Sequence, residues 1–494
     1  MEIFIFMKNL KLILILTLAI ALRFININNY PALNPDEAAL GYNAYSLILT
    51  GKDEHGISWP LHFKSFGDYK PGGYVYLAIP TIKLFGLTPF ATRLPNLIFS
   101  IIGIYYFYLL IKLLSKNNNL ALISALIITI SPWHLHFSRG AWEACTALSF
   151  IIIGTYYFFK DRKFLFILFY VLSLYTYHSA RIIAPVLGLS LVITNYYLLI
   201  TNYKKWLLPL FFGILICLPV LFSFFQNGGT TRFGGVGITA DRGPLNRSEE
   251  LLNQHGNVKL VNRVIHNRRL LYLLSWGQKY FSHFNLNYLF INGDEVPRSK
   301  VPDMGLLYII ELPLLLYGIY KAKNKFFLIW LFIAPLASSL TFQAPSALRS
   351  LPMVIPLIYF IAYGIKEIKK PIIYCLLITV YLISIAYYLD AYYIHYQKRW
   401  PFAWNYGFSK IVPYVNSVKN DYDNIYFTNK YDQPYILYLF FSKYPPHDIQ
   451  KQIKLTPPDK FGFSTVEKID NITFYIPKQI PDKSLVIDDK MFIP

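Results

Sequence analysis

The stretch NPDEAALGYNAYSLILTG, residues 34–51, lies just after the first apolar run and predicts a helix with two acids in its first turn. Asn34 is a good N-cap, Pro35 suits the first helical position, and Glu37 stands three residues after the cap, as in a capping box. Apolar residues then recur on one face until a glycine ends the helix, so we expect it to lie on an apolar surface. Taken alone, Asp36 and Glu37 could simply complement the helix dipole.

The composition is that of a membrane protein with many spans. Of the 494 residues, 55% are hydrophobic and only 15% are charged, and the apolar residues form long runs. The net charge of +20 comes from lysine clusters between these runs, as membrane orientation requires. We therefore expect membrane lipids, and no nucleic acid, as partners. The three cysteines fall inside apolar runs and form no disulfide or zinc pattern.

The apolar runs predict about eleven helices of spanning length, a few of them short. The first run resembles a signal peptide but lacks a small-residue cleavage site, so we expect it to be retained. A further run, Tyr74–Leu87, is short and holds Pro80 and Lys83, which favours a juxtamembrane helix over a span. The expected spans are Met1–Ile25, Ala91–Leu114, Leu120–Phe137, Ala141–Phe159, Phe164–Tyr177, Ile182–Ile200, Trp206–Phe225, Gly305–Tyr320, Phe326–Phe342, Leu348–Ile365 and Ile372–Leu389.

Basic clusters mark alternate short connections and set the expected orientation. They place the N-terminus in the cytoplasm and leave two long loops, residues 26–90 and 226–304, outside, the first of them as helices on the membrane. Residues 1–390 then form the membrane domain. The clusters are Lys8/Lys11, Lys112/Lys116, Lys160/Arg162/Lys163, Lys204/Lys205, Lys321/Lys323/Lys325 and Lys366/Lys369/Lys370.

The polar residues 391–494 predict a small extracytoplasmic α/β domain. Its expected helices are Tyr406–Val418 and Pro434–Phe441, and its expected strands are Asn424–Phe427, Ile472–Ile476 and Leu485–Ile487.

The second outer loop contains two notable stretches. Residues 228–237, GGTTRFGGVG, lack the strand, lysine and helix of a phosphate-binding P-loop, so a lid or spacer is the favoured interpretation. Val258–Phe284 has a helical pattern, with arginines beside leucines and aromatic residues at its later turns. That composition predicts a helix at the bilayer interface.

Carboxylates avoid the middle of the spans and gather at the expected outer face, where several cations lie at the same level. Such a site suits a reaction on a lipid-linked phosphate: the cations hold the phosphate, and a carboxylate deprotonates the attacking hydroxyl or amine. The acids are Asp36, Glu37, Asp53, Glu54, Asp68, Glu143, Asp294, Glu295 and Asp303, and the cations are Lys70, Arg139, Arg181, Arg232 and Arg349.

The order of motifs resembles the GT-C membrane glycosyltransferases, specifically the protein O-mannosyltransferase and aminoarabinose-transferase group. The resemblance covers the whole membrane part. After the acidic helix it is carried by DEHG at Asp53–Gly56, WPLHFKSFGDYKPGGYVYL at Trp59–Leu77, SPWHLHFSRGAWEA at Ser131–Ala144, YTYHSARIIAP at Tyr175–Pro185, YFSHFNLNYLFINGD at Tyr280–Asp294 and ALRSLPMVIP at Ala347–Pro356.

The resemblance implies a polytopic helical enzyme of the cell membrane that transfers a sugar from a polyprenyl-phosphate donor on the extracytoplasmic side. The acceptor would be a lipid, a glycan or a protein. In the family, the acidic pair after the first helix supplies the catalytic aspartate, which corresponds to Asp36, with Glu37 as its neighbour. Direct displacement inverts the anomeric centre and needs one base. Glu37 lies about 100° further around the helix and is better placed to support the cap or a nearby cation.

The family's second signature is an acid before Lys-Pro-Pro, where the lysine meets the lipid phosphate. Here Lys70 matches, but Gly72 replaces the second proline and Tyr69 separates Asp68 from the lysine. Glu143 falls where relatives carry an acid that binds metal or substrate. Metal dependence varies in this superfamily, so the sequence leaves the need for a divalent metal open.

The remaining candidates for substrate binding have structural alternatives. Arg139, Arg181 and Arg349 are cations near the outer ends of spans, where arginines also act as interfacial anchors. His178 could equally be a hydrogen-bonded packing residue. Two other classes of function also fit a membrane protein: a transporter or flippase of lipid-linked sugars, and a scaffold whose outer tail binds a partner. Transporters favour repeated halves and midplane charges, whereas the acids of this chain gather at one face.

Overall fold

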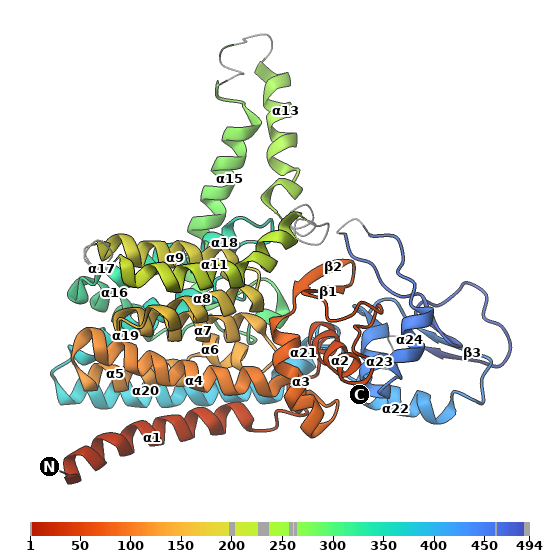
Figure 1. Cartoon of the computed structure of the whole chain (residues 1–494), viewed down its shortest axis with the longest axis horizontal. Coiled ribbons are helices and arrows are strands. Elements are labelled where there is room, and N and C mark those ends of the chain that lie inside the picture. The colour runs from red at the N-terminus through yellow and green to blue at the C-terminus, as the bar shows by residue number, and fades with distance from the viewer. Residues whose placement is uncertain are drawn as a thin grey trace.

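The computed structural model describes residues 2–196, 203–225, 237–255, 260, 264–459 and 462–488. Within these ranges the chain is mainly helical, and long apolar helices lie side by side in one bundle (Figure 1). The bundle helices are α1 (Glu2–Phe24), α4 (Pro89–Ser115), α5 (Asn118–Ile130), α6 (Pro132–Ser138), α7 (Glu143–Phe159), α8 (Lys163–Thr176), α9 (Ala180–Thr194), α11 (Lys204–Phe225), α16 (Glu311–Ala322), α17 (Lys325–Ile333), α18 (Leu336–Ser339), α19 (Val354–Lys366) and α20 (Pro371–Asp390).

Each predicted apolar run overlaps at least one of these helices, but the predicted number of spans is not confirmed. By length and composition, three described helices can cross a membrane: α4, α11 over Lys204–Phe222, and the stretch Pro371–Arg399 that begins with α20. The pair α5 and α6 makes a fourth if it counts as one span, because the two helices are bent by 60° at their junction. Pro132, which has no N–H to donate, starts α6 at this bend.

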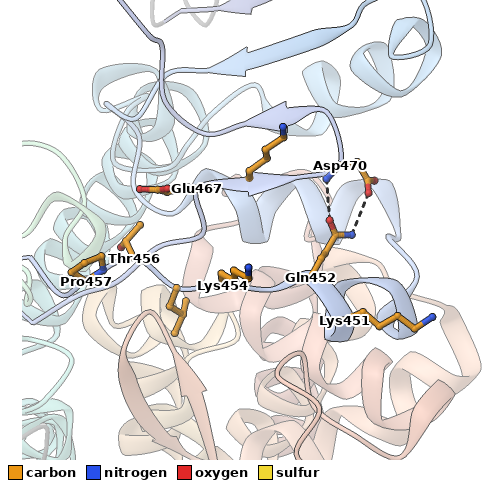
Figure 2. Close-up of a pocket in the computed structure, with 9 residues that line it drawn as sticks. Lys451, Gln452, Lys454, Thr456, Pro457, Glu467 and Asp470 are labelled. Carbon is orange, nitrogen blue, oxygen red and sulfur yellow. Dashed lines mark hydrogen bonds between the residues drawn. The ribbon is translucent and has the colours of Figure 1, made fainter.

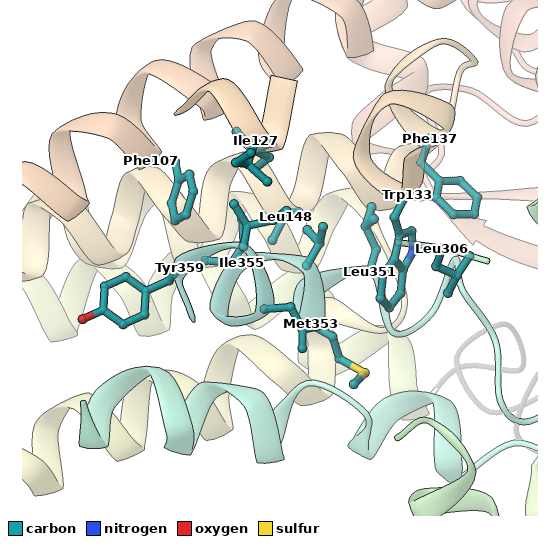
Figure 3. Packing of buried hydrophobic residues seen from close by; sticks show 14 of the residues in the cluster. Phe107, Ile127, Trp133, Phe137, Leu148, Leu306, Leu351, Met353, Ile355 and Tyr359 are labelled. Carbon is teal, nitrogen blue, oxygen red and sulfur yellow. The ribbon is translucent and has the colours of Figure 1, made fainter. Parts of the chain in front are cut away.

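The core of the bundle lies between α4, α5, α7 and α19. Phe107, Ile127 and Leu148 point from the first three of these helices towards Ile355 on α19, and all four side chains are buried (Figure 3). Trp133 of α6 is 1% exposed, and its indole N–H donates to the Ala347 carbonyl at 2.9 Å. The irregular segment around Ala347 is therefore fixed to the bundle.

The two ends of the bundle carry different parts of the chain. The N-terminus and the connections α4–α5 and α16–α17 lie at one end, whereas α2 and the C-terminal region lie at the other (Figure 1). These connections carry two of the predicted cytoplasmic lysine clusters. Which end faces the cytoplasm stays a prediction.

Residues 26–90 contain more than helices. The predicted acidic helix is confirmed as α2 (Pro35–Thr50), with the αL glycine Gly51 as its C-cap. An antiparallel hairpin follows, β1 (His62–Ser65) and β2 (Asp68–Pro71), and then α3 (Gly73–Phe85) on the apolar run that was predicted to be a short helix. The expectation that this loop forms only helices on the membrane is therefore wrong.

The surroundings of α2 also differ from the expectation. Both its apolar face and the polar face carrying Asn43 and Ser46 are buried, with these two side chains 2% and 0% exposed. The C-terminal region covers the polar face at Ser46, whose hydroxyl lies 3.1 Å from Gln450 Nε2, whereas Asn43 bonds to Glu54 in the following loop. An amphipathic pattern predicts one buried face, but it cannot reveal a second contact made by a distant part of the chain.

The C-terminal region contains a four-stranded sheet with the order β4-β5-β3-β6, in which β3 pairs in parallel with β5 and β6. The predicted helices and strands are found, although the strand expected over Ile472–Ile476 is shorter. That the region is a domain of its own stays a prediction, since its apolar core continues into α2 and α3. Its elements are α22 (Phe408–Val418), β3 (Asn424–Phe427), α23 (Pro434–Ser442), α24 (Pro446–Gln452), β4 (Lys468–Ile469), β5 (Ile472–Thr473) and β6 (Ser484–Ile487).

Two helices, α13 (Gly243–His255) and α15 (Arg268–Ser282), project together from the side of the bundle (Figure 1). The later part of the helix predicted over Val258–Phe284 is found as α15, which Asn267 caps, whereas residues 258, 259 and 261–263 lie outside the described residues. Residues 228–236, including Arg232, lie outside the described residues. Short helical turns complete the fold: η1 (Ile238–Ala240), η2 (Asn287–Ile291), η3 (Pro297–Ser299), η4 (Leu351–Met353), η5 (Ala391–His395) and α21 (Tyr396–Arg399).

Candidate active site

The first turn of α2 divides its two acids between different environments. Asn34 and Glu37 form the predicted capping box: the Glu37 N–H donates to Asn34 Oδ1 at 3.0 Å, and the Asn34 N–H donates to Glu37 Oε2 at 3.2 Å. Glu37 is 1% exposed, and Arg93 of α4 binds both of its carboxylate oxygens, at 2.8 and 2.7 Å. The backbone N–H of Ala141 donates to Glu37 Oε1 at 2.7 Å. Glu37 therefore supports the cap and a cation, as its position on the helix predicted.

Asp36 lies on the other side of the turn and remains accessible. Its side chain is 39% exposed, and Lys70 Nζ lies 2.5 Å from Asp36 Oδ1. The side chain of Lys70 is 12% exposed, and its Nζ stands 5.3 Å from the centroid of the Phe66 ring. The structure thus brings together the predicted base and the predicted phosphate-binding lysine from two separate motifs.

Glycines explain the departure from the Lys-Pro-Pro pattern. The Gly72 N–H donates to the Leu61 carbonyl at 3.0 Å, a bond that proline cannot make. A Cβ at Gly72 would lie 2.8 Å from that same carbonyl oxygen, and one at Gly73 would lie 2.6 Å from the Tyr175 carbonyl oxygen. The chain after Lys70 therefore passes too close to its neighbours for larger residues.

His178 and Arg181 hold the hairpin that carries Lys70. His178 Nε2 is 2.9 Å from the carbonyl oxygen of Tyr69, the residue before Lys70. Arg181 Nη2 is 2.7 Å from His62 Nε2 on the opposite strand. Burial and the Arg181 charge lower the pKa of His62 to about 4, so its neutral ring can accept this hydrogen bond. Both predicted substrate-binding residues thus contact the hairpin that carries Lys70.

Arg139 is buried and is bonded to other parts of the chain. Its side chain is 1% exposed, and its two terminal nitrogens donate to four backbone carbonyls in and just after α1, such as Leu22 O at 2.6 Å and Ile25 O at 2.7 Å. Its Nε donates to the Tyr392 hydroxyl at 3.3 Å. With every nitrogen engaged, Arg139 fixes the end of the first helix. Binding of substrate by Arg139 is a prediction that these contacts do not support.

The other three predicted binding residues are spread around the site. Asp68 lies at the hairpin turn, where its carboxylate accepts the Tyr69 N–H at 2.8 Å. Glu143 begins α7 and, like Glu37, is close enough to act electrostatically on the Tyr74 hydroxyl. Arg349 donates to Thr341 Oγ1 at 3.1 Å and lies near Asp294. Their roles in binding remain predictions.

Sequence reasoning missed one acid at this site, Asp432, in the turn just before α23. Arg298 Nη2 lies 3.6 Å from Asp432 Oδ2. Burial raises the pKa of Asp432 and the Arg298 charge opposes this, while Asp36 raises it further and Lys70 lowers it. Asp432 therefore lies within electrostatic range of the Asp36–Lys70 pair. No local motif marks this residue, because only the folding of the C-terminal region onto α2 brings it there.

Two further acids of the segment 26–90 are buried. Asp53 and Glu54 are both 0% exposed, and each has one carboxylate oxygen without a hydrogen-bond partner. Burial raises the pKa of Glu54 to about 8, whereas the Asn43 side chain and the Lys70 charge lower it. At neutral pH Glu54 is thus mostly protonated and adds little negative charge near Lys70.

A separate groove of about 540 Å³ lies on the C-terminal region (Figure 2). Gln452 spans one side of it, because its side chain donates to Asp470 Oδ1 at 3.2 Å and accepts from the Asp470 N–H at 3.0 Å. The Asp36–Lys70 pair is not among the residues that line it. Among the described residues, no group of three His, Cys, Asp or Glu side chains could hold a metal ion.

Comparison with known proteins places this site in a known fold. No family model and no curated protein matches the sequence. The crystal structure of ArnT from Cupriavidus metallidurans bound to undecaprenyl phosphate does match, with a TM-score of 0.56 and 11% identity over 97% of this chain and 90% of that chain. The chain has a GT-C fold. The predicted resemblance is therefore confirmed at the level of the fold, which is that of a multi-pass membrane protein.

A further match is the archaeal oligosaccharyltransferase AglB from Archaeoglobus fulgidus, in complex with an inhibitory peptide and a dolichol-phosphate. Its TM-score is 0.47 at 14% identity, and the match covers 88% of this chain and 63% of AglB.

Proposed function

We propose that this chain is an integral-membrane glycosyltransferase that moves a sugar from a polyprenyl-phosphate donor to an acceptor at the outer membrane face. The observation that carries the proposal is the contact of Lys70 Nζ with Asp36 Oδ1 at 2.5 Å, in a fold shared with a protein crystallised with undecaprenyl phosphate. A cation and a carboxylate in contact, at the end of an apolar bundle, match the two tasks of this reaction: holding a lipid phosphate and removing a proton.

The proposed reaction is a single displacement. The acceptor hydroxyl or amine attacks the anomeric carbon, and its proton passes to the Asp36 carboxylate. The bond from the anomeric carbon to the phosphate oxygen breaks, and its electron pair leaves with the polyprenyl phosphate. Lys70 stabilises the charge that develops on that phosphate. Attack opposite the leaving group inverts the anomeric configuration.

The ion pair also suggests an order of events. In the free protein Lys70 and Asp36 neutralise each other. A donor phosphate offers Lys70 an anion with more acceptor oxygens, so donor binding draws the lysine away from Asp36. The Asp36 carboxylate, no longer paired with Lys70, then accepts the proton of the incoming acceptor.

The test is an incubation of the purified protein, in lipid nanodiscs, with a panel of polyprenyl-phosphate sugars and candidate lipid, glycan and peptide acceptors. Mass spectrometry of lipid extracts and acceptors should reveal one donor that loses its sugar and one acceptor that gains it. A lipid-linked sugar that crosses the bilayer without being cleaved would instead support the transporter alternative. No cleavage of any donor would contradict the proposal.

A further inference from the structure

The C-terminal region contacts α2, the helix that carries Asp36. The Tyr42 hydroxyl donates to the Tyr444 carbonyl at 2.8 Å. Gln450 Nε2 lies within hydrogen-bond distance of Ser46 Oγ, at 3.1 Å, and of Thr50 Oγ1, at 2.9 Å. Through these contacts the C-terminal region covers α2 on the side of Ser46.

The same region contacts the hairpin that carries Lys70. The Ser464 N–H donates to the Phe66 carbonyl at 2.8 Å, and the Phe66 ring meets the Tyr435 ring edge-on, with centroids 6.1 Å apart. On its other side, Phe66 lies under Lys70 Nζ. Phe66 thus connects the C-terminal region directly to the lysine.

We propose that the C-terminal region sets the geometry of the active site. It binds α2 and the hairpin turn at once, and so fixes the position of Lys70 relative to Asp36. This inference rests on the proposed function. A hairpin of two four-residue strands is marginally stable by itself, and a lysine side chain has several rotatable bonds. Outside support is therefore needed to hold the ammonium group where a phosphate must bind, and the C-terminal region supports the turn of the hairpin while His178 and Arg181 support its strands.

Two glycines offer a matched test. Gly67, at the hairpin turn, and Gly56, in the preceding loop, have φ values of +85° and +84°, so alanine strains the backbone equally at both. A Cβ at Gly67 would lie 3.1 Å from Gly462 O and 3.2 Å from Ser464 N, whereas a Cβ at Gly56 meets nothing within 4 Å. Gly67→Ala therefore disturbs the docking contact, and Gly56→Ala is its control.

Hydrogen–deuterium exchange provides a readout that does not depend on activity. We expect Gly67→Ala to speed exchange in residues 62–71 and in the segment around Ser464, while Gly56→Ala leaves both segments as in the wild type. In the donor-cleavage assay, Gly67→Ala should lower turnover by about 10²-fold, the typical effect of a 1 Å misplacement. Equal exchange and equal turnover in the two variants would overturn the inference, and so would a loosened hairpin with normal turnover.

A second pair of variants tests the same inference if Gly67→Ala fails to fold. Gln433 Nε2 donates to the Ser464 carbonyl at 3.1 Å, so Gln433→Met removes a bond that positions the docking segment. Asn471→Leu removes two bonds elsewhere in the same region, from the Asn471 side chain to the Lys419 and Tyr422 carbonyls. Only Gln433→Met should loosen the hairpin and lower turnover; equal effects of the two variants would overturn the inference. If the wild type cleaves no donor, the proposed function fails, while the exchange comparison still decides whether the region holds the hairpin.

Discussion

At the scale of single residues, the contact of Lys70 with Asp36 joins two motifs that the sequence keeps apart. A family resemblance named both residues, but it could not say that they touch. The contact gives each a distinct task, because a lysine can bind a phosphate and only the carboxylate can accept a proton. The roles can therefore be separated by substituting one residue at a time.

Substitution of Lys70 tests the binding of the donor phosphate. We expect Lys70→Ala to weaken donor binding and to lower turnover by about 10²–10³-fold, the usual cost of losing a group that stabilises developing charge. Lys64→Ala, on the neighbouring strand β1 of the same hairpin, is the control. Donor titration measured by tryptophan fluorescence, together with the cleavage rate, checks the prediction. Normal donor binding and cleavage by Lys70→Ala would exclude this role.

Glu54 predicts a pH dependence of stability. Its pKa is about 8 in the folded chain against 4.5 when unfolded, so the folded state holds the proton more tightly. Its contribution to stability is then complete below pH 4.5 and is lost as the pH rises to about 8. Glu54→Gln, which cannot ionise, should therefore gain in melting temperature relative to the wild type between these limits. A difference that stays constant from pH 5 to 9 would show that Glu54 ionises normally.

At the scale of elements, the first turn of α2 depends on the buried pair of Glu37 and Arg93. Removal of one partner leaves the other as an uncompensated buried charge, which typically costs about 3–5 kcal/mol. Glu37→Gln should consequently lower the melting temperature in detergent well below that of Asp36→Asn, since Asp36 is partly exposed. If both variants melted together, Glu37 would have no special structural role.

Helix α2 also shows which features the sequence could predict and which it could not. The cap, the capping box and the terminal glycine of α2 are local features, and all were predictable from the residues themselves. The residues that bind Glu37, and the C-terminal region that covers α2 at Ser46, lie far from α2 in the sequence. No local pattern reveals these contacts. The hairpin was missed for a related reason: its strands are only four residues long, and contacts with Arg181 and Ser464 support them.

At the scale of the whole molecule, the fold was more predictable than the number of spans. The apolar runs located the helices, and the lysine clusters located one end of the bundle. Several helices are shorter than a span or bent, as α5 and α6 are, so a count of apolar runs does not give a count of membrane crossings. The role of Asp432 could not be predicted from the sequence, because only the completed fold brings this residue near Asp36.

Cysteine labelling tests the sidedness. In a variant whose native cysteines are replaced by serine, a membrane-impermeant maleimide added from outside should label Ser58→Cys and spare Lys369→Cys. Both positions are exposed in the structure, and they lie on the expected outer loop and in a predicted cytoplasmic cluster. The reverse pattern would invert the topology and place Asp36 on the cytoplasmic side.

The most direct test of the central claim is the behaviour of Asp36→Asn with the donor that the wild type cleaves. Asparagine keeps the size of the side chain and cannot take the proton, so the variant should fold and bind donor but transfer no measurable sugar. The product of the wild type, analysed by NMR, should have the anomeric configuration opposite to that of the donor. Near-normal transfer by Asp36→Asn would contradict the account, and retention of configuration would reject the single-base mechanism.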